Sequence, residues 1–155
     1  MNRLTNIREN HIDHLAIRQL IDYYNDIINN RNWEALPEIF SINSSWEALA
    51  PINLKFEGIE EIKSGLPKSV QRMKVLIQSS SGIIVEVKNS DEATARSLMT
   101  EFGRPVEDGE GFHAVGFYHD HVIKENGEWK FLSRRFELKY FDTLPVPGTI
   151  SGYKY

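Results

Sequence analysis

The sequence predicts one α+β domain in which helices come first and a long antiparallel sheet follows. In the first third of the chain, apolar residues recur at three- and four-residue steps, which is typical of amphipathic helices. The second half is rich in β-branched and aromatic residues, which favour strands. With 155 residues, 41% hydrophobic and 26% charged, the chain has the size and composition of one folded domain. We expect this domain to span residues 1–155, with an N-terminal arm (1–13) and a C-terminal tail (143–155).

Three helices are predicted before the main run of strands. Residues 14–28 carry apolar side chains on one helical face, and Asp13 is the expected N-cap. A short second helix is expected from residues 32–40, with Asn32 as its cap. Residues 58–66 form the expected third helix, which Pro67 ends or kinks.

Strands are predicted on both sides of the third helix and throughout the second half. The first two are residues 44–50 and 54–56. The later ones are residues 75–79, 83–87, 93–102, 112–124 and 129–140. Asn126-Gly127 predicts a tight hairpin, because this pair readily adopts the two positive φ angles of a type I′ turn. Residues 79–82, Ser-Ser-Ser-Gly, are interpreted as a turn and not as a phosphate loop.

The longest of these strands has no cleanly polar face. Its alternating residues form two sets, Phe112, Ala114, Gly116, Tyr118, Asp120 and Val122 against His113, Val115, Phe117, His119, His121 and Ile123. A sheet that is apolar on both sides needs cover on both. We therefore expect helices over one face and a second copy of the chain over the other, which is a homodimer formed through Val115, Phe117 and Ile123.

Composition excludes several classes of partner. The net charge is −4, from 22 acidic and 18 basic residues, so neither nucleic acid nor an anionic membrane surface is an expected partner. With no cysteine, the chain has no disulfide, thiolate ligand or cysteine nucleophile. The polar N-terminal residues lack the apolar run of a signal peptide or anchor, and we expect a cytoplasmic protein.

Three stretches together resemble the SnoaL-like family of the nuclear-transport-factor-two-like superfamily, which includes scytalone dehydratases, bile-acid dehydratases and polyketide cyclases. The resemblance covers roughly residues 14–142. The three stretches are Ala16-Ile-Arg through Tyr24, Asn29-Asn-Arg-Asn-Trp33-Glu-Ala-Leu36 and Phe40 to Trp46-Glu47; Phe56-Glu-Gly58-Ile-Glu-Glu-Ile62; and Gly116-Phe-Tyr118-His-Asp120 through Glu125-Asn-Gly127-Glu-Trp129-Lys-Phe131 to Arg135.

This resemblance implies a cone-shaped, curved antiparallel sheet wrapped over three N-terminal helices, the cystatin-like barrel, around a mainly apolar cavity. In the family's dehydratases an aspartate and a histidine together form the base, and the resemblance implies which positions of this sequence correspond to them. Tyr24 matches a tyrosine of that pattern, but Asn29 stands at the aspartate position and Gln78 or Ser79 near the histidine position. An amide takes no proton at neutral pH, so the usual pair is absent.

By elimination, the candidate bases are His113 first and Asp120 second, with Tyr24 as a hydrogen-bond donor. His113 and Asp120 have opposite strand parity, so only one of them can face a cavity unless a bulge intervenes. Each residue also has a structural interpretation. His113 could lie at a subunit interface or in the core, Asp120 could pair with Arg134 or Arg135, and Tyr24 could be a core aromatic.

The expected ligand-binding residues surround the same presumed cavity. They are Trp46, Asn29, Gln78, Phe112 and Tyr118, and the small residues Ala48, Ala50, Ala114 and Gly116 leave space beside them. Core packing explains Trp46 equally well. His119 and His121 have a spacing that metal ligands use, but no third ligand is in view, and no dinucleotide fingerprint is present. We therefore predict neither metal nor cofactor.

The sequence thus favours a small-molecule pocket protein, with a cofactor-independent lyase or isomerase of dehydratase or cyclase type as the leading hypothesis. Its substrate would be small, cyclic and partly apolar. The alternative is a non-catalytic ligand-binding or dimerisation module of the same fold, which the absence of the usual base favours. An accessory subunit of a larger enzyme is a third hypothesis.

Overall fold

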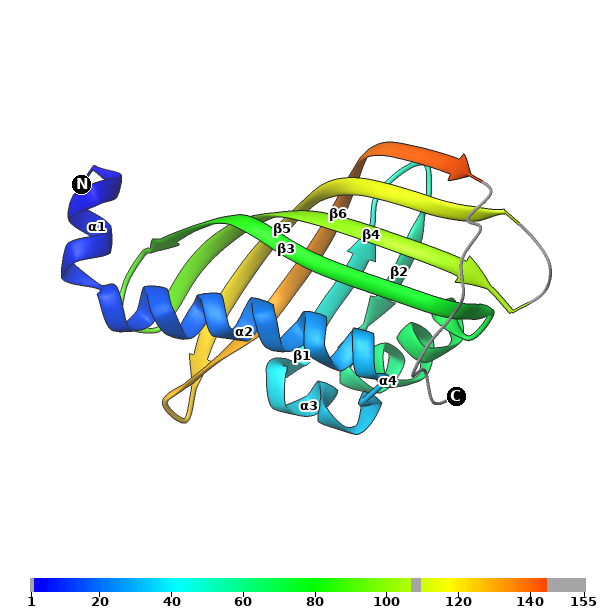
Figure 1. Ribbon diagram of the computed structural model, residues 1–155. Coiled ribbons are helices and arrows are strands. Elements are labelled where there is room, and N and C mark those ends of the chain that lie inside the picture. The colour runs from blue at the N-terminus through cyan, green and yellow to red at the C-terminus, as the bar shows by residue number, and fades with distance from the viewer. Residues whose placement is uncertain (1, 107–109, 145–155) are drawn as a thin grey trace.

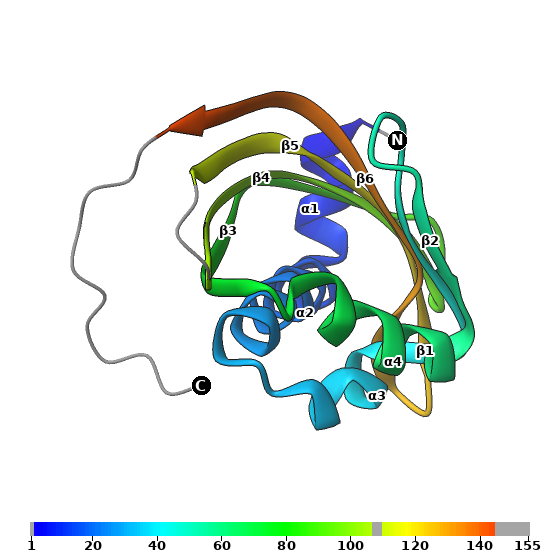
Figure 2. The same cartoon turned by 90° about the vertical axis from the view of Figure 1, so that its right-hand side faces the viewer.

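A curved six-stranded sheet wraps around a layer of helices in a computed structural model, which describes residues 2–106 and 110–144 (Figures 1 and 2). The helices are α1 (Arg3–Glu9), α2 (His11–Asn30), the short 3-10 helix η1 (Trp33–Ala35), α3 (Leu36–Ile39) and α4 (Gly58–Val70). The strands are β1 (Phe40–Ala48), β2 (Leu54–Glu57), β3 (Met73–Val87), β4 (Glu92–Pro105), β5 (Gly111–Glu125) and β6 (Glu128–Leu144). The predicted α+β class with a curved sheet over N-terminal helices is confirmed.

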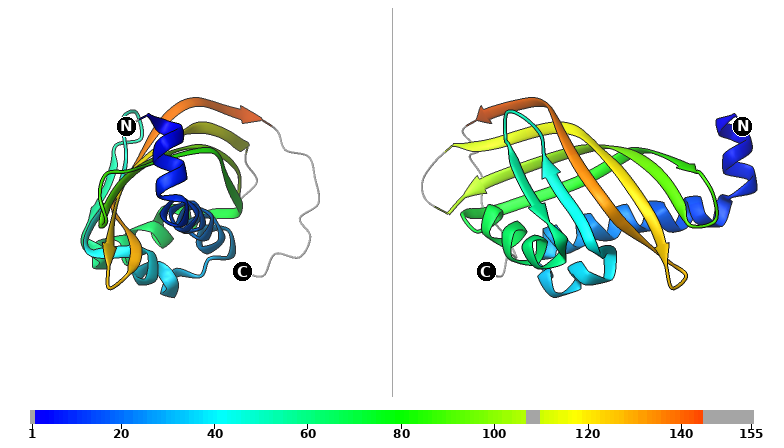
Figure 3. Two further views of the ribbon diagram at one scale, coloured as in Figure 1. Left: turned by 90° about the vertical axis from the view of Figure 1, so that its left-hand side faces the viewer. Right: turned by 180° about the vertical axis from the view of Figure 1, so that it is seen from behind.

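The order of the strands is β2-β1-β6-β5-β4-β3, and two details of the predicted barrel are wrong. β1 pairs with β6 in parallel, whereas every other pair is antiparallel. The sheet is also open, because β2 and β3 form its two edges. The chain places β2, α4, β3, β4 and β5 between β1 and β6, so β6 returns to the side of β1 only after a long crossover. Seen from behind, the strands form one continuous curved surface that lies over α2 (Figure 3, right).

The long helix α2 lies against the concave face of the sheet and supplies much of the core (Figure 2). It begins at His11, before the expected start, and its N-cap is Asn10 and not Asp13. The carboxylate of Asp13 instead accepts hydrogen bonds from the Lys124 ammonium at 2.7 Å and the Trp129 indole N–H at 2.8 Å. Both partners belong to the closing hairpin, far along the chain, so the local capping rule did not apply.

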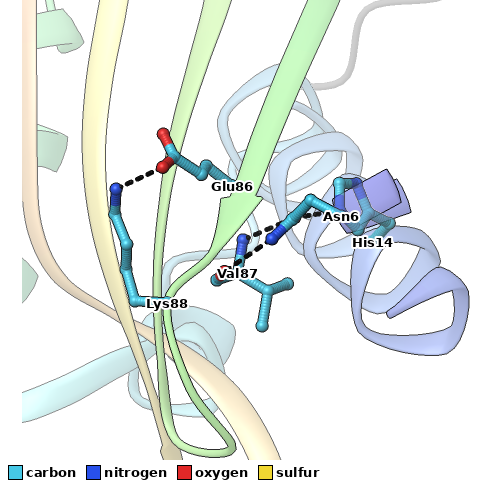
Figure 4. Close-up of polar contacts among 5 residues, drawn as sticks. All are labelled: Asn6, His14, Glu86, Val87 and Lys88. Carbon is cyan, nitrogen blue, oxygen red and sulfur yellow. Dashed lines mark hydrogen bonds and ion pairs between the residues drawn. The ribbon is translucent and has the colours of Figure 1, made fainter. Parts of the chain in front are cut away.

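The expected N-terminal arm contains a helix, α1, which projects at an angle from the start of α2 (Figure 1). The side chain of Asn6 fastens it to the end of β3, donating to the Val87 carbonyl at 2.8 Å and accepting from the Val87 N–H at 3.1 Å (Figure 4). The ring Nε2 of His14 lies 2.9 Å from the same amide oxygen. Since that oxygen only accepts, His14 is the donor. Burial lowers the pKa of His14, which favours the neutral ring.

The serine-rich run at residues 79–82 is not a turn, and the two strands predicted on either side of it are one. β3 continues through the run, with a register shift between Ser81 and Ile84 and a positive φ of 56° at Gly82. One extra residue on β3 faces β4 there, which is a β-bulge that bends the strand. Serine and glycine favour turns and bulges alike, so composition could not separate the two.

The closing hairpin has the predicted form, since Asn126 and Gly127 have φ angles of 52° and 85°. α4 runs past Pro67 to Val70, and β6 extends to Leu144, into the expected tail. The rest of that tail, residues 145–155, lies outside the described residues. No helix in the described part of the chain has the length and apolar character that crossing a membrane requires.

β5 places its even-numbered residues from Ala114 to Val122 on the concave face, where they are buried. Gly116 permits close packing of β6 there, because a Cβ atom would stand 2.5 Å from the Phe136 ring and 2.4 Å from the Glu137 carbonyl oxygen. The odd-numbered residues from His113 to Ile123 lie on the convex face and are partly or fully exposed. This alternation decides which side chains reach the interior.

Candidate functional site

A cavity of about 190 Å³ lies between α2, α4 and the concave face of the sheet. Its walls are mostly apolar, with a small number of polar groups, as ligand sites in proteins are. Ile52, which follows β1, is 46% exposed and also lines the cavity, so this segment forms the outer rim. The lining residues are Tyr24, Ile28, Trp46, Ala48, Ile52, Leu54, Leu66, Ser69, Val70, Gln78, Met99, Glu101, Tyr118 and Phe136.

Tyr24, Trp46 and Tyr118 form a hydrogen-bonded chain in this wall. The Trp46 indole N–H donates to the Tyr24 oxygen at 2.9 Å, and the two tyrosine oxygens are 3.3 Å apart. One of the two hydroxyl hydrogens can bond the other tyrosine, so the second is left for a ligand. Burial raises the pKa of Tyr24 and, more strongly, that of Tyr118. Both phenols are therefore protonated donors at neutral pH.

The two tyrosine rings rest on Arg134, which is fully buried. Its guanidinium carbon lies 3.7 Å from the centre of the Tyr118 ring and 4.2 Å from that of Tyr24. Nη1 of Arg134 donates to Oδ2 of Asp120 at 2.9 Å. Burial raises the pKa of Asp120 to about 6, with the Arg134 charge acting against that rise. The pair is therefore charged at pH 7.

Asp120 thus faces the interior, but it does not line the cavity. Its position matches the structural interpretation, in which it partners Arg134 across the closing hairpin. His113 lies on the opposite face of β5 and is exposed, so its imidazole points away from the cavity. Neither of the two expected bases is placed where it could touch a ligand in this cavity.

The carboxylate that does line the cavity is Glu101 on β4, which the sequence reasoning missed. Glu101 stands directly between Gln78 of β3 and Ala114 of β5. The Gln78 side-chain N–H donates to the Glu101 carboxylate. Burial raises the pKa of Glu101 to about 6, and the Gln78 hydrogen bond opposes the rise. Its charge also contributes to the raised pKa values of both Tyr24 and Tyr118, so these groups share one electrostatic site.

A signal for Glu101 was available in the pattern of β4. Its inward-facing residues from Ala93 to Met99 are apolar or small and buried, and Glu101 continues the same parity. An acid on an otherwise apolar strand face is a candidate for a perturbed pKa. Only the pairing with β3 and β5 showed that this face lines a cavity.

Asn29 and Gln78, which the resemblance placed at the two positions of the usual base, do lie next to each other. The Asn29 side-chain N–H donates to the Gln78 carbonyl at 2.8 Å, and the Gln78 N–H donates to the Asn29 side-chain oxygen at 2.7 Å. Asn29 is thus bonded to the backbone of β3. The side chain of Gln78 remains in the cavity wall, where it is 8% exposed and its Oε1 has no hydrogen-bond partner among residues 2–106 and 110–144.

The remaining expected residues lie elsewhere. Phe112 stacks on Phe141 with ring centres 5.6 Å apart and does not line the cavity. His119 and His121 each bond a separate carboxylate on the convex face. Across residues 2–106 and 110–144, no three His, Cys, Asp or Glu side chains are grouped closely enough to hold a metal ion.

Comparison with known proteins identifies the class to which this fold and cavity belong. The model of the SnoaL-like domain matches residues 10–135, and the chain belongs to the SnoaL-like family. A comparison with curated protein sequences finds no significant match.

Solved structures of similar fold cover nearly the whole chain. A proposed scytalone dehydratase from Novosphingobium aromaticivorans has a TM-score of 0.79 and 22% identity, over 94% of this chain and 97% of its own. A hexachlorocyclohexane dehydrochlorinase, LinA type 3 from Novosphingobium barchaimii, has a TM-score of 0.81 and 18% identity, over 92% and 97%. A protein of unknown function with a cystatin-like fold from Nostoc punctiforme has a TM-score of 0.70 and 25% identity, over 83% and 92%.

Proposed function

We propose that this protein is a cofactor-independent lyase or isomerase that moves a proton within a small, partly apolar cyclic substrate. The observation that carries the proposal is the placement of an acid with a pKa of about 6, Glu101, in one cavity with two buried phenols, Tyr24 and Tyr118. A base with a pKa near neutral combines a large ionised fraction with useful proton affinity.

The proposed first step breaks a C–H bond next to a carbonyl group of the substrate. The proton passes to the Glu101 carboxylate, and the electron pair of that bond moves through carbon onto the carbonyl oxygen. The free phenol hydrogen of the Tyr24–Tyr118 pair donates to this oxygen as its negative charge develops. A donor held in place by Trp46 needs little reorganisation, which is why such preorganised groups are effective.

The second step distinguishes the two reaction classes. In an isomerase, Glu101 returns its proton to another carbon and the electron pair moves back from the oxygen. In a lyase, the electron pair expels a leaving group from the neighbouring carbon, a C=C bond forms, and Glu101 gives its proton to the departing group. The names of two structural neighbours, a dehydratase and a dehydrochlorinase, denote eliminations, and this supports the lyase form of the proposal.

A non-catalytic ligand-binding module is the second candidate. The observation that favours it is the use of Asn29 as a bridge to the β3 backbone, where the family's dehydratases carry a base. We further propose that the protein is a cytoplasmic homodimer. The apolar residues on the convex face of β5 support the dimer, and the absence of cysteine suits a reducing compartment.

Exchange of substrate protons with D₂O, followed by NMR on a panel of cyclic ketones, tests the proposal. Glu101→Gln should lower the exchange rate by about 10²–10⁴-fold, since it removes the proton acceptor and keeps the shape. Glu92→Gln is the matched control on the same strand, because Glu92 bonds His121 on the convex face. Ligand binding without exchange in the wild-type protein would favour the second candidate, and unchanged exchange in Glu101→Gln would exclude Glu101 as the base.

A further inference from the structure

The cavity also restricts which cyclic molecule can occupy it. We infer that its ligand is a single six-membered ring that carries a hydroxyl group at one end and a carbonyl group at the other. This inference rests on the proposed function for its site, but it concerns recognition and not turnover. Three features of the wall carry it: the volume, an unpartnered acceptor and a surplus donor.

Volume limits the ligand to one ring. A cavity of about 150 Å³ with apolar walls accommodates benzene in a well-studied case. The present cavity, at about 190 Å³, therefore holds one ring with a few substituent atoms. Its walls are well-packed side chains such as Met99, which is 2% exposed, and Trp46, whose ring stacks on Phe56 at 5.7 Å. A second fused ring would require these walls to move.

The hydroxyl group is inferred from Gln78. Its amide is oriented by the N–H that donates to Glu101, and its Oε1 is unpaired within the part of the chain that the structure describes. A buried acceptor without a partner costs free energy, and a ligand that supplies a donor removes that cost. Among neutral groups on a small ring, a hydroxyl is the simplest donor.

The carbonyl group is inferred from the tyrosine pair. The Trp46 indole only donates, and one phenol hydrogen is used in the bond between the two tyrosines. The second phenol hydrogen therefore has no acceptor within this group of three. The ligand must therefore offer an acceptor at that end. Gln78 lies on β3 and Tyr118 on β5, with β4 between them, so the two polar groups meet different parts of a bound ring. Glu101 stands on β4, beside Gln78.

Calorimetric titration with three probes tests the inference: 4-hydroxycyclohexanone, 4-methylcyclohexanone of matched size, and the fused bicyclic ketone 2-decalone. The wild-type protein should bind the hydroxy-ketone about tenfold more tightly than the methyl analogue, which is the scale of one buried hydrogen bond. It should bind the bicyclic ketone at least tenfold more weakly than the hydroxy-ketone. Equal affinity for the first two probes, no binding of any probe, or tight binding of the bicyclic ketone would overturn the inference.

Two variants assign the selectivity to the cavity wall. Gln78→Met keeps the length of the side chain and removes the amide, so the ratio of the two monocyclic affinities should fall to about one. A change in the pKa of Glu101 affects both ligands alike and cancels in that ratio. Ser79→Ala is the control, since Ser79 is the exposed neighbour on β3 and should keep the tenfold ratio. A ratio unchanged in Gln78→Met would contradict the role of this residue.

These measurements test the inferred ligand and the proposed function independently of each other. Glu101→Gln should still bind the hydroxy-ketone, whereas it should lose proton exchange. Selective binding by the wild-type protein without any exchange would overturn the proposed function and leave the inferred ligand class standing. Exchange of bulkier ketones with no preference for the hydroxyl group would support the proposed function and overturn the inferred ligand class.

Discussion

At the scale of single residues, two buried acids have similar pKa values and different tasks. Glu101 and Asp120 are both raised to about 6 by burial. Asp120 is bonded to a buried guanidinium and does not line the cavity, whereas Glu101 lines the cavity and accepts a hydrogen bond from a neutral amide. A perturbed pKa alone would not distinguish them. The two acids are distinguished by their hydrogen-bond partners and by whether they line the cavity.

Glu101 should make stability depend on pH in a defined direction. Its pKa rises from 4.5 in the unfolded chain to about 6 in the fold, so the folded state binds more protons between these values and stability falls as pH rises through that window. At pH 8, where Glu101 is ionised, its burial lowers the free energy of unfolding by about 2 kcal/mol. Glu101→Gln should accordingly raise the free energy of unfolding at pH 8 by about 1–2 kcal/mol and change it little at pH 4, as measured by urea titration. An equal effect at both pH values would show that the raised pKa is wrong.

Tyr24 should matter more for chemistry than for stability. Tyr24→Phe removes the acceptor of the Trp46 N–H and breaks the donor chain to Tyr118. We expect kcat to fall by about 10²-fold, the scale of one preorganised donor, and the unfolding free energy to fall by about 1–2 kcal/mol. Steady-state kinetics and urea denaturation on the same variant separate the effects. A lower stability with unchanged kcat would make Tyr24 a core residue only.

Asp120→Asn should act mainly on folding. The substitution leaves the Arg134 charge buried between aromatic rings without its counter-ion, and breaking a buried pair in this way costs about 3–5 kcal/mol. Urea denaturation should show this loss, whereas activity per folded molecule should fall far less than in Glu101→Gln. If kcat of folded Asp120→Asn instead falls as much as that of Glu101→Gln, Asp120 takes part in the chemistry.

At the scale of elements, α1 shows how a short helix is held by one side chain. Asn6 satisfies both the N–H and the carbonyl of Val87 at the end of the edge strand β3, much as a neighbouring strand would. The helix has only seven residues, too few for stability from helix propensity alone. Its position therefore depends on this contact.

Asn6→Ala should detach α1 from the sheet. We expect a loss of about 1–3 kcal/mol, because Val87 and His14 lose their shared partner, and faster hydrogen exchange at the Val87 amide. Asn89→Ala is a suitable control, since Asn89 lies in the exposed turn after β3. Equal exchange rates at Val87 in Asn6→Ala and in the wild-type protein would mean that α1 is held by other contacts.

At the scale of the whole molecule, the sheet has one covered face and one open face. The helices cover the concave side (Figure 2), and apolar side chains on the convex side, including Val115 and Phe117, are only partly buried. Apolar residues gathered on one side of a sheet are typical of surfaces that bind another protein.

The homodimer is therefore tested on this face. Light scattering at micromolar concentration should give a mass of about twice the 17.9 kDa of one chain. Val115→Asp places a charge in the proposed interface and should give a monomer with an unchanged far-ultraviolet spectrum, whereas Asp26→Ala on the exposed side of α2 should remain dimeric. A monomeric wild-type protein would exclude the dimer.

The sequence by itself determined the features that depend on neighbours along the chain. The helical spacing of Ile17 to Ile28 predicted the core face of α2, the Asn126-Gly127 pair predicted the closing turn, and alternation along β5 predicted which side chains share a face. The family resemblance added the curved sheet, which local patterns do not contain.

Only the tertiary structure decided which side chains meet in the cavity. Gln78 and Glu101 are 23 residues apart, and Tyr24 and Tyr118 are 94 apart. Their contacts depend on the register of β3, β4 and β5 and on the position at which α2 packs against the sheet. Likewise, the exposure of His113 and the ion pair of Asp120 follow from which face of β5 the helices cover. Alternation defines two faces, but the choice between them is made by long-range packing, and that packing placed Glu101, and neither His113 nor Asp120, in the wall of the cavity.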